Sequence, residues 1–332
     1  MVETMNRCVR FVRKQDAQFI SEAFEDRPLL PGEILGKTVV SLISTGSERG
    51  GYMDYNDNMA YPQVTGYAAI LEVLEIGPGV TKVQKGDLFF AGTPHHLYNR
   101  VHEEDILPVP AGLPPEKAVY CRFPAVSLSS IVQMPVSPTE PVLVMGLGLV
   151  GLMCAQVLQN FGYDVWSVDP VRRRRDNARL NGILHAVSGV DEIPAELTGK
   201  FGAAFDCSGD ESAIYGCADK IRHGGHLFLV GVPWRKTTDE DGHRLLLKIF
   251  YGFLHVHSGW EWTLPRRSGD FLPESHYRCL EKSLQWIAEG KLRMDDIAAV
   301  VDPSDCPEVY REIGDGELQH KANCVMFDWR AY

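Results

Sequence analysis

Residues 146–151 constrain the fold most strongly: they read Gly-Leu-Gly-Leu-Val-Gly and separate two stretches of different character. Before them, residues 141–145 form a short apolar run typical of a buried strand. After them, residues 149–161 have the length and apolar content of a helix, which Gly162 can end. A strand, a glycine turn and a helix in this order predict a βαβ unit and therefore a parallel sheet.

The same alternation continues along the chain. A second strand is expected at 164–169, and a charged helix from about 172 to 182 follows it. Further strands are expected at 203–207 and 226–230. Because strands alternate with helices, we interpret residues 122–262 as a doubly wound parallel α/β domain.

Residues 1–121 predict a β-rich domain instead. Turn residues separate several short apolar or alternating runs in this part of the chain. The expected strands are 39–43, 69–76 and 88–91. The last segment, 263–332, carries a predicted helix around 277–289 and a strand at 323–327. We expect this segment to return to the first domain.

The composition excludes several classes of protein. A chain of 332 residues that is 45 % apolar is not disordered, and its length favours two domains. Its net charge of −11 argues against nucleic acid or an anionic membrane as partner. No apolar stretch reaches the roughly 18 residues of a transmembrane helix, and the first residues lack a secretory signal. The 8 scattered cysteines contain no C-x-x-C pair, which favours a cytoplasmic protein with reduced thiols.

The glycine turn indicates a dinucleotide-binding site. Gly146 would form the tight turn, Gly148 would let the backbone approach a pyrophosphate, and Gly151 would let helix and strand pack closely. The free N–H groups at the start of the helix, at Leu149 and Val150, would bind the phosphates.

An acidic residue supports the same interpretation. Asp169 lies 18 residues after Gly151, where a carboxylate can bind both ribose hydroxyls. It favours NAD over NADP, because it repels a 2′-phosphate. The four arginines at 172–175 leave NADP open, although a solvated helix face with one arginine, Arg174, on the adenine is the favoured interpretation.

At this point the chain resembles the medium-chain dehydrogenase/reductase superfamily over nearly its whole length. The resemblance rests on Gly66-Tyr67, on the segment 77–87, on 146–151, and on 206–209 (Asp-Cys-Ser-Gly). It implies a GroES-like β-rich catalytic domain followed by a Rossmann domain, and a small-molecule substrate. It also implies a homodimer formed by edge strands, for which the apolar, strand-like run 245–256 is a candidate.

The resemblance also implies further cofactor contacts beyond the glycine turn. It places Cys207 and Ser208 along the ribose wall. It places Val230, Gly231 and Val232 beside the nicotinamide, with the backbone of the two valines facing the ring.

The chain departs from the zinc-dependent members at the metal ligands. Those members carry Cys-Gly-Thr/Ser-Asp and Gly-His-Glu motifs, whereas residues 45–48 here read Thr-Gly-Ser-Glu and 66–68 read Gly-Tyr-Ala. Cys121 alone stands where a third ligand is expected, and residues 88–120 lack the cysteines of a structural zinc lobe. Since zinc needs three protein ligands at a catalytic site, we expect no bound metal.

The string 44–49 (Ser-Thr-Gly-Ser-Glu-Arg), together with Gly-Tyr at 66–67, resembles one subset of the superfamily. That subset includes the bacteriochlorophyllide hydroxyethyl dehydrogenase and sugar or cyclitol dehydrogenases. The glutamate that follows Gly-Tyr in the subset is Ala68 here, so the substrate is not transferred.

Without zinc, protein groups must handle the proton of the alcohol. We predict Tyr67 as proton donor and acceptor, Ser47 as its relay and Thr45 as an auxiliary donor. The alternatives are that Tyr67 fills the volume of the lost ligand, and that the two hydroxyls only cap a turn.

Aromatic and polar residues suggest a substrate with many hydroxyl groups or a flat conjugated one. The candidate substrate-binding residues are Tyr52, Cys121, His257 and Trp260. A role for Cys121 as a small core residue stays open.

Three functions remain in view. The leading one is a zinc-independent, NAD(H)-dependent oxidoreductase of a secondary alcohol or ketone, such as a sugar or cyclitol. The second is an NADPH-dependent enone or quinone reductase. The third is a non-catalytic cofactor-binding protein.

Overall fold

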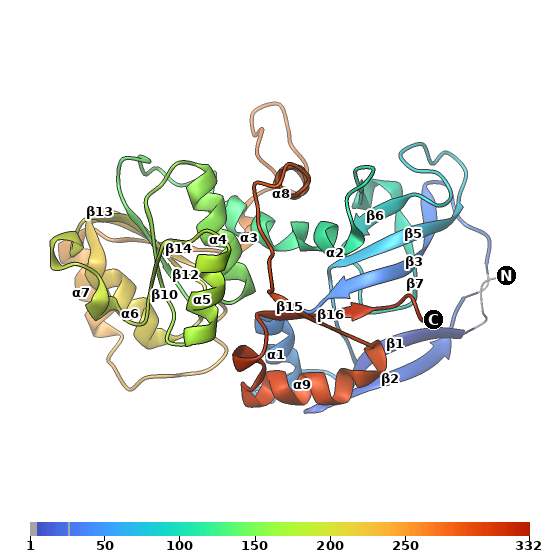
Figure 1. Cartoon of the computed structure of the whole chain (residues 1–332), viewed down its shortest axis with the longest axis horizontal. Coiled ribbons are helices and arrows are strands. Elements are labelled where there is room, and N and C mark those ends of the chain that lie inside the picture. The colour runs from blue at the N-terminus through green and yellow to red at the C-terminus, as the bar shows by residue number, and fades with distance from the viewer. Residues whose placement is uncertain (1–4, 26) are drawn as a thin grey trace. The chain divides into compact units, whose positions relative to one another are not determined.

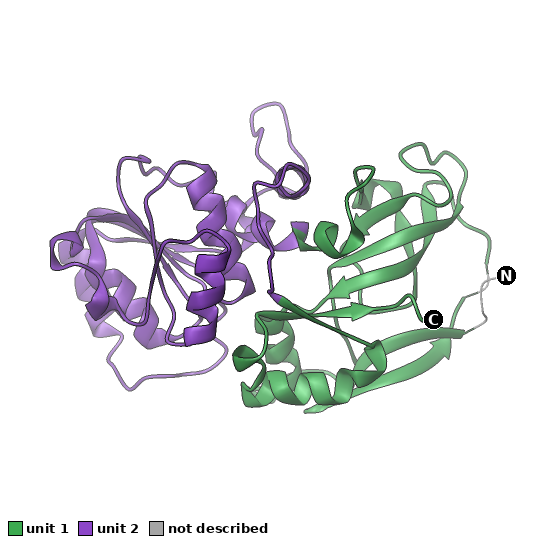
Figure 2. Cartoon of the chain, viewed as in Figure 1, with its two compact units in different colours: residues 1–120, 298–332 green, residues 121–297 purple. Residues whose placement is uncertain are grey.

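The structure is a computed structural model that describes residues 5–25 and 27–332. The chain forms two compact units (Figure 2). Unit 1 combines residues 1–120 with residues 298–332, and unit 2 consists of residues 121–297. The expected C-terminal segment 263–332 is thus divided, because only its last part joins unit 1.

Unit 1 is built on two sheets (Figure 1). The strands of the larger sheet, in spatial order, are β15 (Ala298–Val301), β16 (Cys324–Asp328), β3 (Glu33–Leu42), β5 (Ala69–Ile76), β6 (Leu88–Ala91) and β8 (Ile106–Pro108), with β7 (Tyr98–His102) paired to β3. The smaller sheet has the order β2 (Asp16–Ala23), β1 (Met5–Arg13) and β4 (Gln63–Val64). The expected strands of the first domain overlap β3, β5 and β6. The antiparallel pairing of β16 with β3 ties the end of the chain to its first part.

In its described residues, unit 1 also contains the α-helices α1 (Thr45–Met53), α2 (Pro115–Ala118) and α9 (Cys306–Asp315). Helix α9 packs against α1 and β2 around an aromatic core. Tyr52 belongs to this core: it is 6 % exposed, its ring lies 5.8 Å from that of Tyr310, and its Oη donates to the Gln15 carbonyl. The sequence predicted that Tyr52 faces a substrate, whereas the structure places it inside the unit.

Unit 2 contains a six-stranded, wholly parallel sheet, which confirms the predicted α/β class. In spatial order its strands are β11 (His185–Val187), β10 (Val165–Val168), β9 (Val142–Met145), β12 (Phe201–Asp206), β13 (Ile221–Leu229) and β14 (His255–Ser258). The order reverses between β9 and β12, as in a doubly wound dinucleotide fold. Ligands bind such sheets at the carboxyl ends of the strands next to the reversal.

Six helices accompany this sheet among the described residues: α3 (Arg122–Ile131), α4 (Leu149–Asn160), α5 (Arg172–Leu180), α6 (Glu211–Lys220), α7 (His243–Gly252) and α8 (His276–Ala288). Helices α4 and α8 pack on α3, while α6 packs on β12 and β13. Because α8 buries its apolar face against α3, the segment from 263 to 297 belongs to unit 2.

The run 245–256 is not one strand, as its apolar character suggested. It forms most of α7, and the chain then turns at Phe253 into the short strand β14. Phe253 adopts a left-handed conformation, with φ 52°, that ends the helix. A short apolar run can form either a helix or a strand, and its hydrophobicity alone does not distinguish the two.

Candidate active site

The glycine turn between β9 and α4 is shaped by close backbone contact. Gly146 has φ +87°, a conformation that L-residues rarely adopt. A Cβ on Gly151 would lie 1.7 Å from the Gly146 carbonyl oxygen, so only glycine fits there. Gly148 is the N-cap of α4, and a Cβ there would meet only the Arg174 Nη2, at 4.0 Å. The backbone at Gly148 is thus free of close neighbours on that side, as a phosphate requires.

The turn is held to the neighbouring strands at the same edge of the sheet. The Gly146 N–H donates to the Val168 carbonyl at 2.8 Å, and the Cys207 N–H donates to the Met145 carbonyl at 2.8 Å. Ser208 packs against Gly146, because a Cβ on that glycine would lie 3.1 Å from the serine Cβ. The structure therefore brings Gly146, Cys207 and Ser208 together, and the place of Cys207 and Ser208 beside the ribose stays a prediction.

The segment after β13 packs on the same cluster. A Cβ on Gly231 would lie 2.3 Å from the Gly209 nitrogen, and one on Gly209 would lie 2.4 Å from the Val232 oxygen. Val230 and Gly231 both donate their N–H groups to the Asp206 carbonyl, at 2.8 and 2.7 Å. Val232 is 48 % exposed. The segment 230–232 therefore lies against the turn that follows β12.

Asp169 is buried beside the glycine turn. Its Oδ2 accepts from the Leu147 N–H at 2.7 Å, and its Oδ1 accepts from the Val171 N–H at 2.8 Å. The Arg174 Nη1 lies 3.4 Å from Oδ2, and the arginine side chain is 24 % exposed. The carboxylate thus fixes the glycine turn, and Arg174 lies over Gly148 within reach of a phosphate.

Asp206 is a residue of this site that sequence reasoning did not single out. It is fully buried, and its carboxylate accepts from the Ser208 hydroxyl at 2.5 Å and from the Ser208 and Gly209 N–H groups. Burial raises its pKa to about 6, although these hydrogen bonds oppose the shift. The signal was present, because an acid at the end of an apolar strand is unusual.

Tyr67 and two serines form a cluster of hydroxyl groups in unit 1. The Tyr67 Oη is hydrogen-bonded to the Ser44 Oγ and lies 3.2 Å from the Ser47 Oγ. Ser44 is the N-cap of α1 and Ser47 lies in its first turn. Ser44 was not predicted, although it belongs to the string 44–49. Thr45 lies next to these residues, but its hydroxyl has no hydrogen bond within the described part of the chain.

A buried acid holds this helix end in place. The Glu48 Oε1 accepts from the Ser44 N–H at 2.8 Å. Its Oε2 accepts from the hydroxyls of Thr65, at 2.6 Å, and Tyr310, at 2.5 Å, and lies 3.2 Å from the His95 Nε2. Burial opposes ionisation of Glu48, but the His95 imidazole and these hydrogen bonds outweigh it and lower its pKa. Glu48 is a positioning residue, since its oxygens are already engaged.

His95 continues this network into the core of unit 1. Its Nδ1 lies 2.7 Å from the Ser41 Oγ, which accepts from the Trp329 Nε1 at 2.9 Å. Because the Glu48 carboxylate accepts, the His95 Nε2 donates to it, and in the neutral imidazole Nδ1 then accepts the Ser41 hydroxyl proton. The network links β3, α1 and the end of the chain behind the hydroxyl cluster.

The remaining predicted substrate residues lie in unit 2. Cys121 is fully buried at the start of α3, and burial raises the pKa of its thiol. His257 lies within the sheet, where its Nε2 is 2.9 Å from the His226 Nδ1 and its ring packs on Phe228. Trp260 is 66 % exposed. A substrate role for these three residues stays a prediction.

The donors near Tyr67 do not suit zinc. Zinc in proteins binds thiolate, imidazole and carboxylate groups, whereas this cluster offers three hydroxyls. Among residues 5–25 and 27–332, no group of three or more His, Cys, Asp or Glu side chains could hold a metal ion.

Known proteins share this fold and part of this sequence. Residues 150–251 match the family model of zinc-binding dehydrogenases. The chain is 32 % identical to an L-galactonate-5-dehydrogenase of Escherichia coli over 142 residues, 41 % of each chain. It is 25 % identical to an L-threonine 3-dehydrogenase of Thermococcus kodakarensis over 80 % of this chain and 83 % of that one. The alignments with the first three curated relatives cover 29–41 % of their length.

Solved structures match nearly the whole chain. Galactitol-1-phosphate dehydrogenase from Escherichia coli superposes with a TM-score of 0.79 at 16 % identity, over 97 % of this chain and 99 % of that one. Acetophenone reductase from Geotrichum candidum, solved with NAD, has a TM-score of 0.80 at 13 % identity, over 99 % and 98 %. The chain therefore has the fold of these dehydrogenases, and its residues 150–251 resemble the zinc-binding dehydrogenase family. No helix in the described residues is long and apolar enough to cross a membrane.

Proposed function

We propose that this protein is an NAD(H)-dependent, zinc-independent dehydrogenase of a secondary alcohol, with a sugar, cyclitol or related polyol as substrate. The observation that carries the proposal is the contact of the Tyr67 hydroxyl with Ser44 and Ser47. The names of the relatives support the substrate class, since they include dehydrogenases of L-galactonate and galactitol-1-phosphate.

The nicotinamide, when bound, accepts or returns the hydride. The glycine turn of unit 2 would hold the pyrophosphate of the dinucleotide at Gly148, Leu149 and Val150, with Arg174 beside them. Asp169 favours NAD, because a second anion next to its buried carboxylate is unfavourable. The single arginine over Gly148 is the observation in favour of NADP.

The proposed proton path begins at Tyr67. A phenol has one proton, so its oxygen donates to one serine and accepts from the other. When alcohol is oxidised, Tyr67 takes the hydroxyl proton of the substrate and passes its own proton to Ser44 or Ser47, and that serine releases its hydroxyl proton to water. Both serines belong to the N-terminal end of α1, where the helix dipole favours negative charge on a nearby oxygen.

The experiment compares two panels of substrates with enzyme dialysed against a chelator. Oxidation of NADH and NADPH is followed with keto-sugars and keto-cyclitols in one panel, and with enones and quinones in the other. Turnover limited to the first panel supports the proposal. Turnover limited to the second assigns the protein to the alkene reductases, and dependence on added zinc contradicts zinc independence. Cofactor binding without turnover on either panel supports a non-catalytic role.

We also propose that the protein forms a homodimer through the edge of unit 2. Strand β14 ends the sheet, so its outer backbone groups are unpaired within it. Helix α7, which precedes it, has no buried residue, and Leu246, Phe250 and Tyr251 are 61 %, 73 % and 68 % exposed. A second copy would continue the sheet and cover these apolar side chains.

A further inference from the structure

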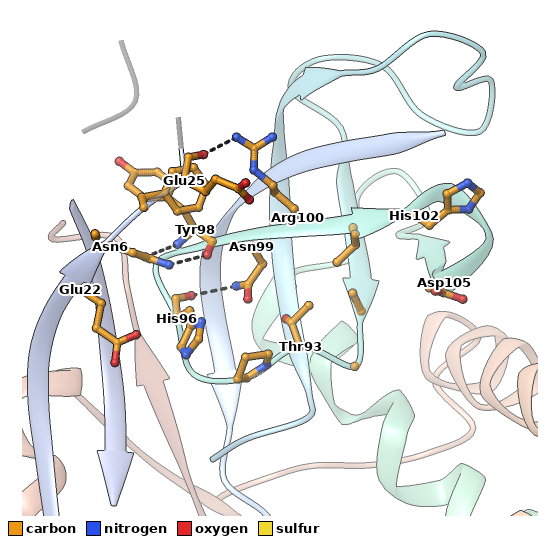
Figure 3. Close-up of a pocket in the computed structure, with 16 residues that line it drawn as sticks. Asn6, Glu22, Glu25, Thr93, His96, Tyr98, Asn99, Arg100, His102 and Asp105 are labelled. Carbon is orange, nitrogen blue, oxygen red and sulfur yellow. Dashed lines mark hydrogen bonds between the residues drawn. The ribbon is translucent and has the colours of Figure 1, made fainter. Parts of the chain in front are cut away.

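A pocket of about 620 Å³ lies in unit 1, and Figure 3 shows the residues that line it. It is bordered by the open end of the β1–β2 hairpin, at Asn6 and residues 22–25, by β7, and by the loop 92–96 between β6 and β7. None of the residues assigned above to the dinucleotide or to proton transfer lines it. We propose that this pocket binds a small, uncharged polyhydroxylated molecule of the sugar or polyol class.

The first argument is a set of buried polar atoms that have no partner. Thr93, His96 and Arg100 line the pocket. The Thr93 Oγ1, the His96 Nε2 and the Nε and Nη1 of Arg100 are buried without a hydrogen bond in the described residues. Thr93 is 6 % exposed. Native structures leave few such groups unpaired, because burial removes them from water. A bound ligand would satisfy them.

The second argument is an acceptor with a fixed orientation. The Asn99 Nδ2 donates to the His96 carbonyl at 3.0 Å and to the Thr38 Oγ1 at 3.2 Å. The amide is therefore held, and its Oδ1 accepts no hydrogen bond from a described residue. Asn99 is 6 % exposed and lines the pocket. Its oxygen is a ready acceptor for a ligand hydroxyl.

The third argument is charge. Glu22 is paired with Arg10, at 2.5 Å, and Glu25 with Arg27, at 3.1 Å, so neither carboxylate is left without a cation. Arg100 and Asp105 bring one charge of each sign to the lining. The pKa of His96 is lowered to about 4, by burial and then by the nearby Arg10, so its ring is uncharged at neutral pH. Because Arg27 also pairs with Glu33, at 2.7 Å, the carboxylates here outnumber the guanidinium groups, and an anion gains no net attraction.

The chemistry of these groups suits hydroxyls. A hydroxyl both donates and accepts, so it can pair with the Asn99 oxygen, with the Thr93 hydroxyl and with either tautomer of His96. The N–H groups of Arg100 can donate to a second ligand oxygen, and the Phe24 ring, 5.2 Å from that guanidinium, offers an apolar face to C–H groups. The volume leaves room for a ligand of monosaccharide size.

The test is titration calorimetry of the whole chain with myo-inositol as probe and gluconate as its anionic counterpart. We expect saturable binding of myo-inositol and weaker binding of gluconate. Thr93→Val, which exchanges an unpaired hydroxyl for a methyl group, is expected to weaken binding about three- to tenfold. Its thermal midpoint should not fall, because the lost hydroxyl has no partner in the free protein.

Two further variants locate the binding. Thr139→Val removes an exposed threonine hydroxyl in unit 2 and should leave the affinity unchanged. Ser47→Ala removes a hydroxyl of the proposed proton path, so a loss of affinity in this variant reports binding at the proposed substrate site instead of the pocket. Absence of saturable binding, tighter binding of gluconate, or loss of binding in Ser47→Ala but not in Thr93→Val would overturn the proposal. The readout is binding, so it is independent of whether the proposed dehydrogenase activity is found.

Discussion

Gly151 and Gly146 touch across the first turn of α4, where a Cβ on Gly151 would lie 1.7 Å from the Gly146 carbonyl oxygen. This contact fixes how helix α4 leaves strand β9. Gly148, in the same turn, has no such neighbour: a Cβ added there would find a flexible arginine nitrogen at 4.0 Å as its nearest atom. Gly151 therefore serves the packing of helix and strand, whereas Gly148 leaves space for a ligand.

We expect Gly151→Ala and Gly148→Ala to separate these purposes. Gly151→Ala should destabilise the protein by about 3 kcal/mol or more, because the backbone must move to admit the methyl group. Gly148→Ala should leave stability nearly unchanged and still weaken NADH binding, since its methyl group would occupy the phosphate position. Urea unfolding and NADH fluorescence titration measure the two effects. Unaltered NADH affinity in a folded Gly148→Ala variant would show that the phosphate does not bind at this turn.

Tyr67→Phe tests the proton path. A positioned proton donor contributes about 10²- to 10⁴-fold to turnover, so we expect kcat to fall by that range while cofactor binding is kept. Tyr163→Phe, which removes a hydroxyl bonded to the Val136 carbonyl in unit 2, is the matched control and should retain kcat. Full activity of the Tyr67→Phe enzyme would mean that Tyr67 only fills space beside the serines and transfers no proton.

Asp206 gives a prediction about pH. Its pKa in the folded protein is raised to about 6 from 3.8, so the folded state holds this proton more tightly than the unfolded state. Its contribution to stability is therefore complete below about pH 4 and is lost as the pH rises to about 6, to a total of about 3 kcal/mol. Asp206→Asn does not titrate and should lack this fall. Urea unfolding of both proteins across this range measures the difference, and parallel stability curves would contradict the assignment.

The sequence was sufficient for much of unit 2. An apolar strand, a glycine turn and a helix determine each other locally, so β9, α4 and the carboxyl edge of the sheet could be predicted without knowledge of distant contacts. The placement of Cys207 and of 230–232 followed from the family resemblance. Asp206 was missed because its burial depends on three strands that meet only in the folded sheet.

Errors arose where distant segments decide the environment. Tyr52 has the composition of a binding residue, but α9, more than 250 residues later, covers it. The run 245–256 is apolar, but most of it forms a helix that has no buried residue. Its hydrophobicity therefore did not indicate burial in a sheet. Ser44 was passed over for its neighbour Ser47, since the two are distinguished only by the reach of the Tyr67 side chain.

The exposed face of α7 predicts a change in oligomeric state. Phe250→Ser should produce monomers if a second copy covers this helix, because the ring is 73 % exposed in a single chain. Phe271→Ser, at a residue 97 % exposed elsewhere in unit 2, is the control and should leave the oligomer unchanged. Size-exclusion chromatography with light scattering measures the mass. A wild-type monomer would contradict the proposed dimer directly.

The ion pair between Arg122 and Glu261 gives the last prediction. Both side chains are mostly buried, at 11 % and 5 % exposure, and the His276 Nε2 lies 3.4 Å from the same carboxylate. Glu261→Gln leaves the guanidinium buried without its counter-charge, which should cost about 3–5 kcal/mol of the free energy of unfolding. Glu308→Gln breaks an exposed pair with Arg311 and should cost about 1 kcal/mol or less.

The same pair should make stability depend on acidity. Burial opposes the charge of Glu261, but His276 and Arg122 outweigh it, so its pKa is lowered from 4.5 in the folded protein. Its stabilising contribution is therefore present above about pH 4.5 and lost as the pH falls through the folded value. Urea unfolding of the wild type and Glu261→Gln should give curves that converge in acid, because the protonated carboxyl no longer pairs with Arg122. A difference that stayed constant into acid would mean that the glutamate acts through its shape rather than its charge.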